Sequence, residues 1–393
     1  MSISLVLYDR FEGRNDLLPL VATRPIGNLR LGAFTLDQKW GFIFDTVSSY
    51  LTEEYLSKKF PLKTVSEKVL VINAAALPNK NLVKKLKNLS LNERLIDSNG
   101  DWIAFVSTVN SSEEIIQLLE SDEFDNIVFE EEYSRLKYLE DIFTYNATQI
   151  EFDVELLNGL DYESISSGVY SAASAVICEN VTLDSTKGSI LIFDDAIIES
   201  GSVIHGPAVI GKQSRVKSGT VIYSNVTVGD KTTVGGELNN TVIWGNSAKG
   251  HYGYLGCAVI GEGCNLGAGT SNSNLKNDWN SVKLYSYQYN NFRNTGLLKC
   301  GVFIGDHSMI AISSKINTGT VIGIGSQIAM SNFIPKFVPD YSWLSDSKFD
   351  SYDIVKFLDM MRRKSDVKKE SFTADDIAIL EYIYKKTTGL RNY

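Results

Sequence analysis

The stretch Ile198–Val234 reads IESGSVIHGPAVIGKQSRVKSGTVIYSNVTVGDKTTV, and an Ile or Val stands at every sixth position of it. The same period returns at Ile260 and runs again from Ile304 to Ile334. Neither the helical period of about 3.6 residues nor the two-residue period of a strand produces this pattern, whereas a β-solenoid with one short strand and one turn per hexad does. The expected inward positions are Ile198, Ile204, Ile210, Val216, Ile222, Val228, Val234, Ile260, Leu266, Ile304, Ile310, Ile316, Ile322, Ile328 and Ile334.

Two segments interrupt the repeat. The phase breaks between Val234 and Ile260, and a longer segment between Leu266 and Ile304 lies outside the register. Loops that leave a regular scaffold are where binding and catalytic residues concentrate. We therefore expect function in these two segments.

The pattern changes on either side of the solenoid, which we place at residues 165–340. Residues 1–160 alternate short apolar runs with helix-like stretches and predict an α/β domain, while residues 341–393 predict a helical tail. The expected strands include Ile3–Leu7, Val69–Ile72, Trp102–Val106 and Ile127–Phe129, and the expected helices include Leu36–Tyr50 and Ser112–Leu119. In the tail, Ile354, Phe357, Leu358 and Met361 share one helical face, and a second helix starts at Thr373 as N-cap and turns Ile377, Leu380 and Tyr384 inward.

Composition narrows the class of protein. The chain has 393 residues, 44% of them apolar and 22% charged, with a formal net charge of −9. An acidic chain is a poor match for nucleic acid, because a phosphate backbone needs clustered Lys and Arg. The sequence shows neither a membrane-spanning run nor a signal peptide, and its four cysteines lack C-x-x-C spacing. We expect a cytosolic protein with reduced, buried thiols.

Chemistry-bearing residues concentrate in three short stretches near the interruptions. They are Lys249–Gly256 (KGHYGYLG), Asn265–Thr270 (NLGAGT) and Asn274–Asn277 (NLKN). A pure scaffold has no need for a His, two Tyr and several Asn in so short a span. Histidine, with a pKa near 6.5, suits removal of a proton from an amine at neutral pH, and the Gly-rich backbone suits stabilisation of an oxyanion.

These stretches resemble a known family. H-x-x-Y-L-G at His251–Gly256 and the following N-L-G-A-G-T are similar to the acetyltransferase domain of the bifunctional N-acetylglucosamine-1-phosphate uridylyltransferase/glucosamine-1-phosphate acetyltransferase family. The resemblance extends over essentially the whole chain, through motifs at Leu17–Trp40, Ser273–Asp278, Phe303–His307, Asn317–Gly323 and Pro335–Pro339. It implies a nucleotidyltransferase-like N-terminal domain, a left-handed parallel β-helix and a homotrimer that binds acetyl-coenzyme A between neighbouring solenoids.

The resemblance also implies roles for single residues. His251 matches the general base that deprotonates the sugar amine. The other matches are Tyr254, Asn265 and Asn274 for the sugar, and Ala268, Gly269 and Ser313 for the thioester end of acetyl-coenzyme A. Lys249 and Lys276 are candidates for phosphate contacts, with plain exposed lysines as the alternative. The chain departs from the family at Asn239, where better-known members carry a lysine in the sugar pocket.

Zinc is a further candidate ligand, because β-helix carbonic anhydrases bind it through three histidines. At one coil per ~18 residues, His205, His251 and His307 lie about two coils or more apart, so we reject a trihistidine site. We expect His205 and His307 to be turn residues.

The N-terminal half predicts a weaker nucleotide site. Its cations Arg14, Arg24, Arg30 and Lys39 suit the charge of a nucleoside triphosphate, with ordinary surface charge as the alternative. The phosphate loop has only one glycine between Tyr8 and Arg14, and Asn73 replaces the expected metal-binding Asp. Asp141 and Asp153 match acidic positions of the branch and are the candidates for magnesium, with helix capping as the alternative.

Three functions remain open. The first is a bifunctional enzyme that acetylates glucosamine-1-phosphate with acetyl-coenzyme A and transfers a nucleotidyl group from UTP to give a UDP-sugar. The second is a sugar-1-phosphate nucleotidyltransferase whose solenoid serves trimerisation and regulation. The third is a non-catalytic trimeric scaffold. The intact set of His251, Tyr254, Asn265 and Asn274 favours the first.

Overall fold

The computed structural model describes residues 3–64, 66–109, 111–121, 123–157 and 160–391. The chain forms two compact units. The first contains residues 1–14, 24–29 and 34–137, and the second contains residues 15–23, 30–33 and 138–393. The division therefore differs from the expected boundary at residue 160. Helix α5 (Asp141–Leu156), the C-terminal tail and two short N-terminal segments belong to the unit that holds the solenoid.

The first unit is built on a mixed six-stranded sheet in the order β2-β1-β3-β5-β4-β6. Strand β1 is parallel to β2 and β3, whereas β5 is antiparallel to β3 and β4. The strands are β1 (Ser4–Tyr8), β2 (Ser48–Leu51), β3 (Val69–Asn73), β4 (Glu93–Ile96), β5 (Trp102–Ser107) and β6 (Asp125–Val128). The expected α/β domain is confirmed.

The helices of this unit are α1 (Leu36–Phe44), α2 (Glu54–Ser57), α3 (Lys80–Lys87) and α4 (Ser112–Leu119). Helix α4 has the predicted bounds and begins with a capping box of Ser111 and Glu114. The predicted helix Leu36–Tyr50 is wrong beyond Phe44. Asp45 ends α1 in a left-handed conformation with a φ of 49°, and Ser48–Leu51 pairs with β1 as strand β2.

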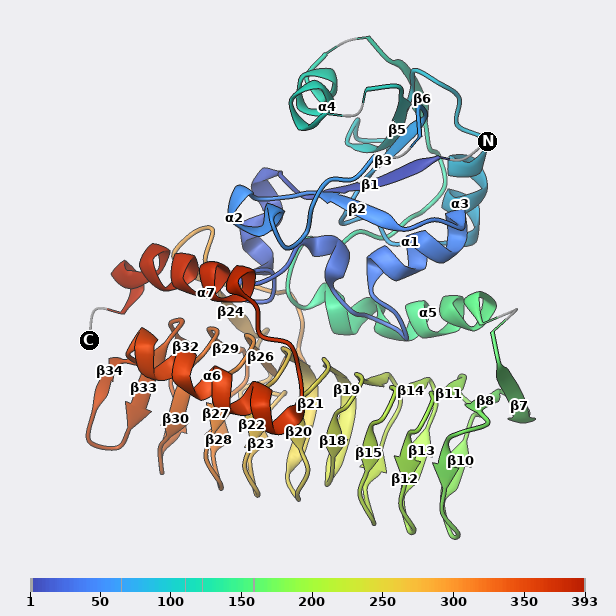
Figure 1. Ribbon diagram of the computed structural model, residues 1–393. Helices are drawn as coiled ribbons and strands as arrows, with labels where there is room; N and C mark the ends of the chain where they lie inside the picture. The colour runs from blue at the N-terminus through green and yellow to red at the C-terminus, as the bar shows by residue number, and fades with distance from the viewer. Residues whose placement is uncertain (1–2, 65, 110, 122, 158–159, 392–393) are drawn as a thin grey trace. The chain divides into compact units, whose positions relative to one another are not determined.

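The second unit is a parallel β-solenoid with three faces (Figure 1). Face A contains β8 (Val169–Ala172), β11 (Ile190–Ile192), β14 (Ala208–Ile210), β17 (Val226–Val228), β26 (Val302–Ile304), β29 (Thr320–Ile322) and β32 (Phe337–Val338). Face B contains β9 (Val176–Ile177), β12 (Ile197–Ile198), β15 (Arg215–Val216), β18 (Thr233–Val234), β20 (Ala248–Lys249), β22 (Asn265–Leu266), β27 (Met309–Ile310), β30 (Gln327–Ala329) and β33 (Ser342–Ser345). Face C contains β10 (Thr182–Asp184), β13 (Val203–His205), β16 (Val221–Ile222), β23 (Ser271–Asn272), β28 (Lys315–Ile316) and β31 (Phe333–Ile334). The long strands β19 (Glu237–Ile243) and β21 (Tyr254–Ile260) run from face C into face A.

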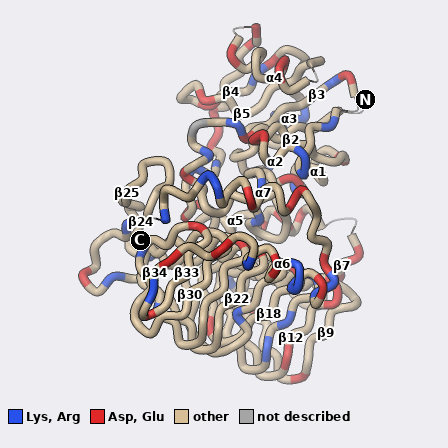
Figure 2. The backbone as a smooth tube through the Cα atoms, turned by 60° about the vertical axis from the view of Figure 1, so that its left-hand side comes forward, with Lys and Arg blue, Asp and Glu red and all other residues tan. Residues whose placement is uncertain are grey.

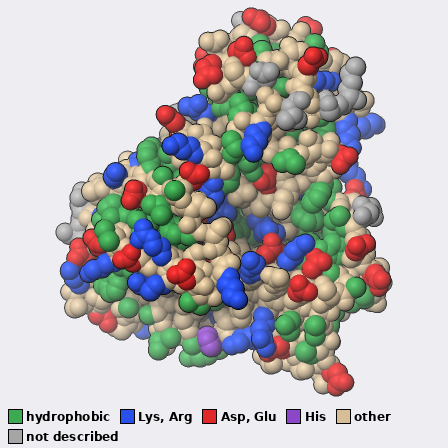
Figure 3. Space-filling model, in the orientation of Figure 1, with side chains coloured by type: hydrophobic (Ala, Val, Ile, Leu, Met, Phe, Trp, Pro, Cys, Tyr) green, Lys and Arg blue, Asp and Glu red, His purple; other side chains and the backbone are tan. Residues whose placement is uncertain are grey.

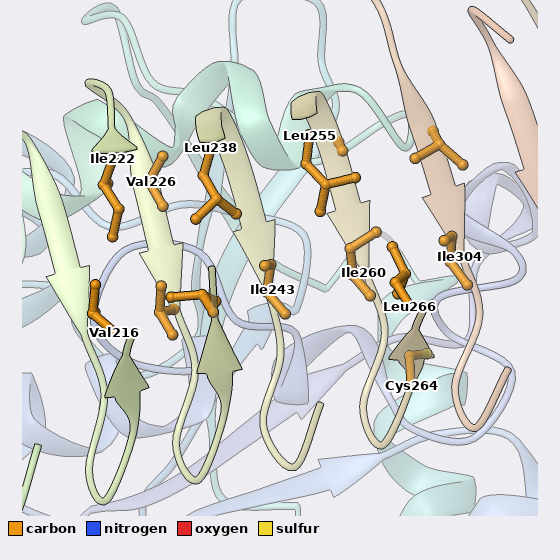
Figure 4. Packing of buried hydrophobic residues seen from close by; sticks show 14 of the residues in the cluster. Val216, Ile222, Val226, Leu238, Ile243, Leu255, Ile260, Cys264, Leu266 and Ile304 are labelled. Atoms are coloured by element: carbon orange, nitrogen blue, oxygen red, sulfur yellow. The ribbon is translucent and has the colours of Figure 1, made fainter. Parts of the chain in front are cut away.

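The solenoid interior is an aliphatic stack. All fifteen predicted inward residues lie in one buried cluster, and Figure 4 shows part of it, with Val216, Ile222 and Leu266 among the labelled side chains. Each coil stacks its aliphatic side chains on those of the next, so hydrophobic burial and parallel backbone pairing reinforce each other. The sequence period therefore specified the solenoid correctly.

Two antiparallel elements and a hairpin complete the strands. Strand β7 (Tyr162–Ser166) pairs with β8, and β34 (Phe349–Ser351) pairs with β33, so each end of the solenoid has an antiparallel partner. The hairpin of β24 (Lys283–Ser286) and β25 (Asn291–Asn294) lies in the predicted insertion between Leu266 and Ile304.

Helices α5, α6 (Ile354–Lys368) and α7 (Ala374–Lys386) pack on the solenoid or on each other (Figures 1 and 2). Thr373 caps α7 as predicted, and Phe357, Leu358 and Met361 of α6 are buried as predicted. The inward face of α7 is partly wrong, because Ile379 and Ile383 are buried with Leu380 while Ile377 and Tyr384 are only half-buried. The remaining elements are short 3-10 turns at Glu12–Leu17, Ile26–Asn28 and Thr388–Leu390.

The surface carries charges of both signs. Lys and Arg side chains are interspersed with Asp and Glu on the face that Figure 3 shows. Among the described residues, the helices are all too short or too polar to cross a lipid bilayer.

Candidate functional site

The first predicted interruption is a shortening of the coil rather than a loop. Val216 pairs with Val234, 18 positions later, but Ile222 pairs with Leu238, only 16 positions later. This loss falls at the corner between faces B and C, where Leu238 follows Val234 by four positions and Ile222 follows Val216 by six. The corner between faces C and A is also compressed, by one position, because Ile243 follows Leu238 by five and Val228 follows Ile222 by six, and β19 and β21 run through it unbroken. Asn240 and Cys257 turn these corners with φ values of 51° and 49°. The expectation of an excursion loop here is wrong, but polar residues do gather at this corner.

A hydrogen-bonded polar cluster occupies this compressed corner. Asn274 Nδ2 donates to Tyr254 Oη at 3.2 Å and also lies 3.4 Å from Cys257 Sγ. Asn240 Nδ2 donates to the same sulfur at 3.3 Å. Two of the predicted sugar contacts, Tyr254 and Asn274, are thus brought together from positions 20 residues apart. Asn240 and Cys257 escaped the sequence analysis, although the break in the six-residue period marks their location.

The phenol of Tyr254 lies along the outside of face C. A Cβ atom at Gly256 would stand 2.2 Å from Tyr254 Oη, so only glycine leaves room for this ring. Burial raises the pKa of Tyr254, while Asn239 and Asn274 lie beside the hydroxyl and oppose that shift. The phenol therefore stays protonated at neutral pH and can donate a hydrogen bond. Asn239, the departure from the family pattern, contributes directly to this cluster.

His251 lies in the corner between faces B and C, between β20 and β21. Its side chain is exposed, and that of the neighbouring Tyr252 is 70% exposed. A base that must meet a substrate amine needs this access. Tyr254 begins face C directly after this corner, and its phenol reaches Asn274.

The positions predicted for acetyl-coenzyme A follow this same edge of the solenoid. Ser313 N donates to Ala268 O at 2.7 Å, and Gly269 N donates to Tyr252 O at 2.9 Å. Ala268, Gly269 and Ser313 therefore stack coil upon coil beside the His251 corner. Asn265 is exposed on the outside of face B, where its N–H pairs with Ser308 O at 3.1 Å.

The two lysines of the predicted site have different surroundings. Lys276 forms an ion pair with Asp278 at 3.0 Å and is partly exposed, so it is accessible to a phosphate. Lys249 is only 1% exposed, and its Nζ donates to Gly235 O at 3.1 Å and His251 O at 2.5 Å. Burial lowers the pKa of Lys249 to about 8. Both sequence-based expectations for Lys249, a phosphate contact and an exposed lysine, are therefore wrong.

The predicted nucleotide-binding cations of the first unit are internally engaged. Arg14 is 4% exposed, pairs with Asp9 at 3.2 Å and donates to Arg24 O at 3.1 Å. Asp9 also accepts from Ile26 N at 2.9 Å, and burial raises the pKa of this carboxyl although Arg14 opposes the shift. Lys39 is fully buried and Arg24 is half-buried. Asp9 was not identified from the sequence, and it organises this loop.

The T-R-P…R-x-G signature is divided between the two units. Thr23 hydrogen-bonds Asp306, and Arg30 Nη2 pairs with Asp230 at 3.1 Å, both within the solenoid unit. Trp244 Nε1 donates to Arg30 O at 3.1 Å. The guanidinium of Arg30, which was predicted to bind nucleotide, therefore forms an ion pair with the carboxylate of Asp230.

The predicted magnesium pair does not fit one ion. Asp141 and Asp153 stand near opposite ends of α5, about 18 Å apart at 1.5 Å rise per residue. Asp141 accepts from Tyr138 N at 2.8 Å, and the buried Asp153 accepts from Ala33 N at 2.7 Å. The capping alternative for Asp141 is wrong as well, because the N-cap of α5 is Glu140 and Tyr138 lies before the helix. Within the described residues, no group of three His, Cys, Asp or Glu side chains is arranged to hold a metal ion.

The remaining histidines and cysteines have local surroundings. His205 Nδ1 lies 2.9 Å from Asp184 Oδ2, and its ring stacks on Tyr223. His307 has a φ of 61°, as expected of a turn residue. The four cysteines are free, and Cys257, Cys264 and Cys300 are buried while Cys178 is partly exposed.

Comparison with known proteins identifies a family model for the N-terminal part of the chain. Residues 5–160 match the sugar nucleotidyl transferase family, so this part of the chain is a sugar nucleotidyltransferase domain joined to a hexapeptide β-helix. The chain is 34% identical over 137 residues to "Bifunctional protein GlmU" of Wigglesworthia glossinidia brevipalpis. The aligned region covers 35% of this chain and 25% of that protein. It is 34% identical over 170 residues to "Bifunctional sugar-1-phosphate nucleotidylyltransferase/acetyltransferase" of Sulfurisphaera tokodaii. This aligned region covers 41% of this chain and 39% of that protein.

The chain thus spans well under half the length of these two relatives. A solved structure of UDP-N-acetylglucosamine acyltransferase from Francisella novicida overlaps 55% of this chain and 86% of its own, at 17% identity and a TM-score of 0.30. Overlap at this level carries no information about substrate.

Proposed function

We propose that the chain is a bifunctional sugar-1-phosphate transferase. At the solenoid it transfers the acetyl group of acetyl-coenzyme A to the amine of glucosamine-1-phosphate, and at the N-terminal domain it transfers a nucleotidyl group from UTP to the sugar phosphate. The observation that carries the first activity is the Tyr254–Asn274 hydrogen bond on face C, whose strand β21 begins directly after the corner with the exposed His251. The match of residues 5–160 supports the second.

The acetyl transfer uses the site residues in distinct roles. His251 accepts a proton from the sugar ammonium, which frees the nitrogen lone pair to attack the thioester carbonyl. The C–N bond forms, the C–S bond of the tetrahedral intermediate breaks, and the thiolate of coenzyme A leaves and takes up a proton. The backbone N–H of Ala268 is suited to stabilise the oxyanion, because the N–H groups of the flanking Gly267 and Gly269 are bonded to Ile310 O and Tyr252 O. Tyr254, Asn239 and Asn274 hydrogen-bond the sugar.

The nucleotidyl transfer is assigned to the cations of the first unit, Arg14, Arg24 and Lys39. Arg24 is the candidate for this role because it is half-buried and lies in the first unit, with its Nη1 3.5 Å from Asn28 Oδ1, whereas the guanidinium of Arg30 is paired with Asp230. Asp141 and Asp153 do not form a shared magnesium site, so we assign no metal-dependent step to them. The alternative of a single-activity nucleotidyltransferase with a regulatory solenoid predicts no acetyl transfer.

The proposal includes a homotrimer, because acetyl-coenzyme A in this family is expected between neighbouring solenoids. Light scattering checks it directly. A particle of the monomer mass, 43.6 kDa, at working concentration would contradict the trimer and the shared cofactor groove.

One assay separates the alternatives. Purified protein is incubated with acetyl-coenzyme A, glucosamine-1-phosphate, UTP and magnesium, and the products are identified by mass spectrometry. N-acetylglucosamine-1-phosphate and a UDP-sugar are both expected. A UDP-sugar without acetylation would support the regulatory solenoid, and neither product would support the scaffold.

A further inference from the structure

Lys249 is an exception inside the solenoid. It pairs with Val234 and so stands at an inward position of face B. The other inward residues of that face include Ile198, Val216, Val234, Leu266, Ile310 and Ile328, which belong to the buried hydrophobic cluster. A lysine at such a position costs stability unless its charge is compensated, and a hydrophobic side chain would pack there at no such cost. Its presence calls for a role other than packing.

The regular corners between faces B and C show what Lys249 replaces. Ser202 and Thr220 both donate a hydroxyl to the corner carbonyl of Lys217. Further along the same edge, Thr270 and Ser314 both donate to Ala311 O, at 3.1 and 2.8 Å. A ladder of Ser and Thr hydroxyls thus satisfies the corner carbonyls from inside the coil. This follows the general rule that buried carbonyls are paired.

Two glycines interrupt this ladder, one in the coil that carries His251 and one in the coil before it. Val221 pairs with Glu237, and Glu237 pairs with Tyr254. The residues that directly precede these three, Thr220, Gly236 and Gly253, are therefore equivalent positions of successive coils. Both have positive φ values, 81° and 121°. A Cβ at Gly253 would lie 2.2 Å from Thr270 O, and a Cβ at Gly236 would lie 2.6 Å from Gly253 O. Ser and Thr are therefore excluded at both positions.

Lys249 supplies the missing donor. Its Nζ donates to Gly235 O, which is the equivalent of Lys217 O in the next coil, and to His251 O, one residue beyond the equivalent position in its own corner. We infer that Lys249 is a positioning residue, which holds the His251 corner from inside the solenoid so that the imidazole is presented to the amine substrate. This inference rests on the proposed acetyl transfer. It adds to that proposal a residue that touches neither substrate nor cofactor.

The test replaces Lys249 by methionine, an unbranched side chain of similar length without a donor. We expect Lys249→Met to lower kcat for acetyl transfer by roughly 10- to 100-fold, the cost of a small misplacement of a catalytic group. The KM for acetyl-coenzyme A should stay within about twofold, because misplacing the base alters the chemical step rather than binding. The melting temperature should be equal to or above that of the wild type, because the buried charge is gone.

A matched control distinguishes positioning from general damage. Val216→Ala truncates an inward residue of the same face away from the His251 corner. We expect it to lower the melting temperature and leave kcat unchanged at a temperature where the protein is folded. The two variants should therefore affect activity and stability in opposite ways.

A second readout does not depend on activity. Hydrogen exchange of the amides of residues 250–253 should be faster in Lys249→Met than in the wild type, and unchanged in Val216→Ala. If the wild type transfers no acetyl group, the proposed function fails while exchange still decides the positioning role. Unchanged exchange at residues 250–253, or a kcat equal to that of the wild type in an active enzyme, would overturn the role of Lys249.

Discussion

The solenoid and the N-terminal unit contain similar kinds of polar residue, but the solenoid makes their significance easier to recognise. In the solenoid every inward position has equivalents one coil away, so Lys249 and the shortened coils stand out against a regular background. The N-terminal unit has a mixed sheet without a repeat. The ion pair of Asp9 and Arg14 therefore has no equivalent elsewhere in the unit with which it can be compared. A repeat therefore provides an internal reference that a single-copy domain lacks.

The largest expected effect tests the solenoid side of this comparison. His251→Ala should reduce acetyl transfer by roughly 10²–10⁴-fold, because general-base assistance is lost. Higher pH should partly restore the rate, since more of the sugar amine is then unprotonated. Steady-state rates across roughly pH 6 to 9, a window around the ordinary histidine pKa, measure both effects.

His205→Ala is the matched control for this variant. His205 also lies in the solenoid but contacts Asp184 and Tyr223, so its removal should leave acetyl transfer unchanged. A His251→Ala rate equal to that of the wild type throughout the pH range would exclude His251 as the base. The regulatory solenoid would then be the better explanation.

The next effect concerns stability. Ile316 is 1% exposed in the stack, and Ile316→Asp should lower the free energy of unfolding by about 3–5 kcal/mol, because the carboxylate lacks a partner there. Urea unfolding measures the change. The neighbouring Lys315 points outward and is exposed, so Lys315→Asp should cost far less. Equal losses for the two variants would show that the inward register is incorrect.

A smaller, selective effect tests the division of the N-terminal signature. Arg24→Ala should impair nucleotidyl transfer and spare acetyl transfer, because distant sites usually behave independently. Arg30→Ala should affect nucleotidyl transfer less, since the Arg30 guanidinium is already paired with Asp230. Parallel assays of the two activities in both variants provide the measurement. A greater loss in Arg30→Ala would contradict this division of roles.

The smallest effect is a pH dependence. The pKa of Lys249 is lowered by burial from 10.5 to about 8, so between these values the unfolded chain binds more protons than the folded chain. Stability conferred by this site should therefore rise with pH across that window, by up to about 3 kcal/mol. Urea unfolding of the wild type and Lys249→Met at pH 7, 8, 9 and 10, values chosen to span roughly this shift, isolates the contribution. A constant difference between the two proteins would mean that Lys249 does not titrate there.

The sequence predicted local structure best where a single interaction dominates it. The predicted helix start at Ser112 and the predicted N-cap at Thr373 are both correct, because the capping side chain and the backbone donor lie within one turn. The predicted helix Leu36–Tyr50 ran too far, because pairing of Ser48–Leu51 with β1 depends on a strand about 40 residues away. Local propensity carries no information about such a partner.

For the candidate site too, the sequence identified the residues, whereas their contacts depended on the tertiary structure. The six-residue period determined the solenoid and its inward stack, since each hexad repeats the same short-range requirement for one aliphatic side chain. The motif stretches identified His251, Tyr254 and Asn274 without any coordinates. Only the tertiary structure brought Asn274 to Tyr254, paired Arg30 with Asp230 and placed Lys249 beneath His251. Those contacts depend on how many residues each coil contains and on which corner carbonyls lack a hydroxyl, and both are properties of stacked coils rather than of any one segment.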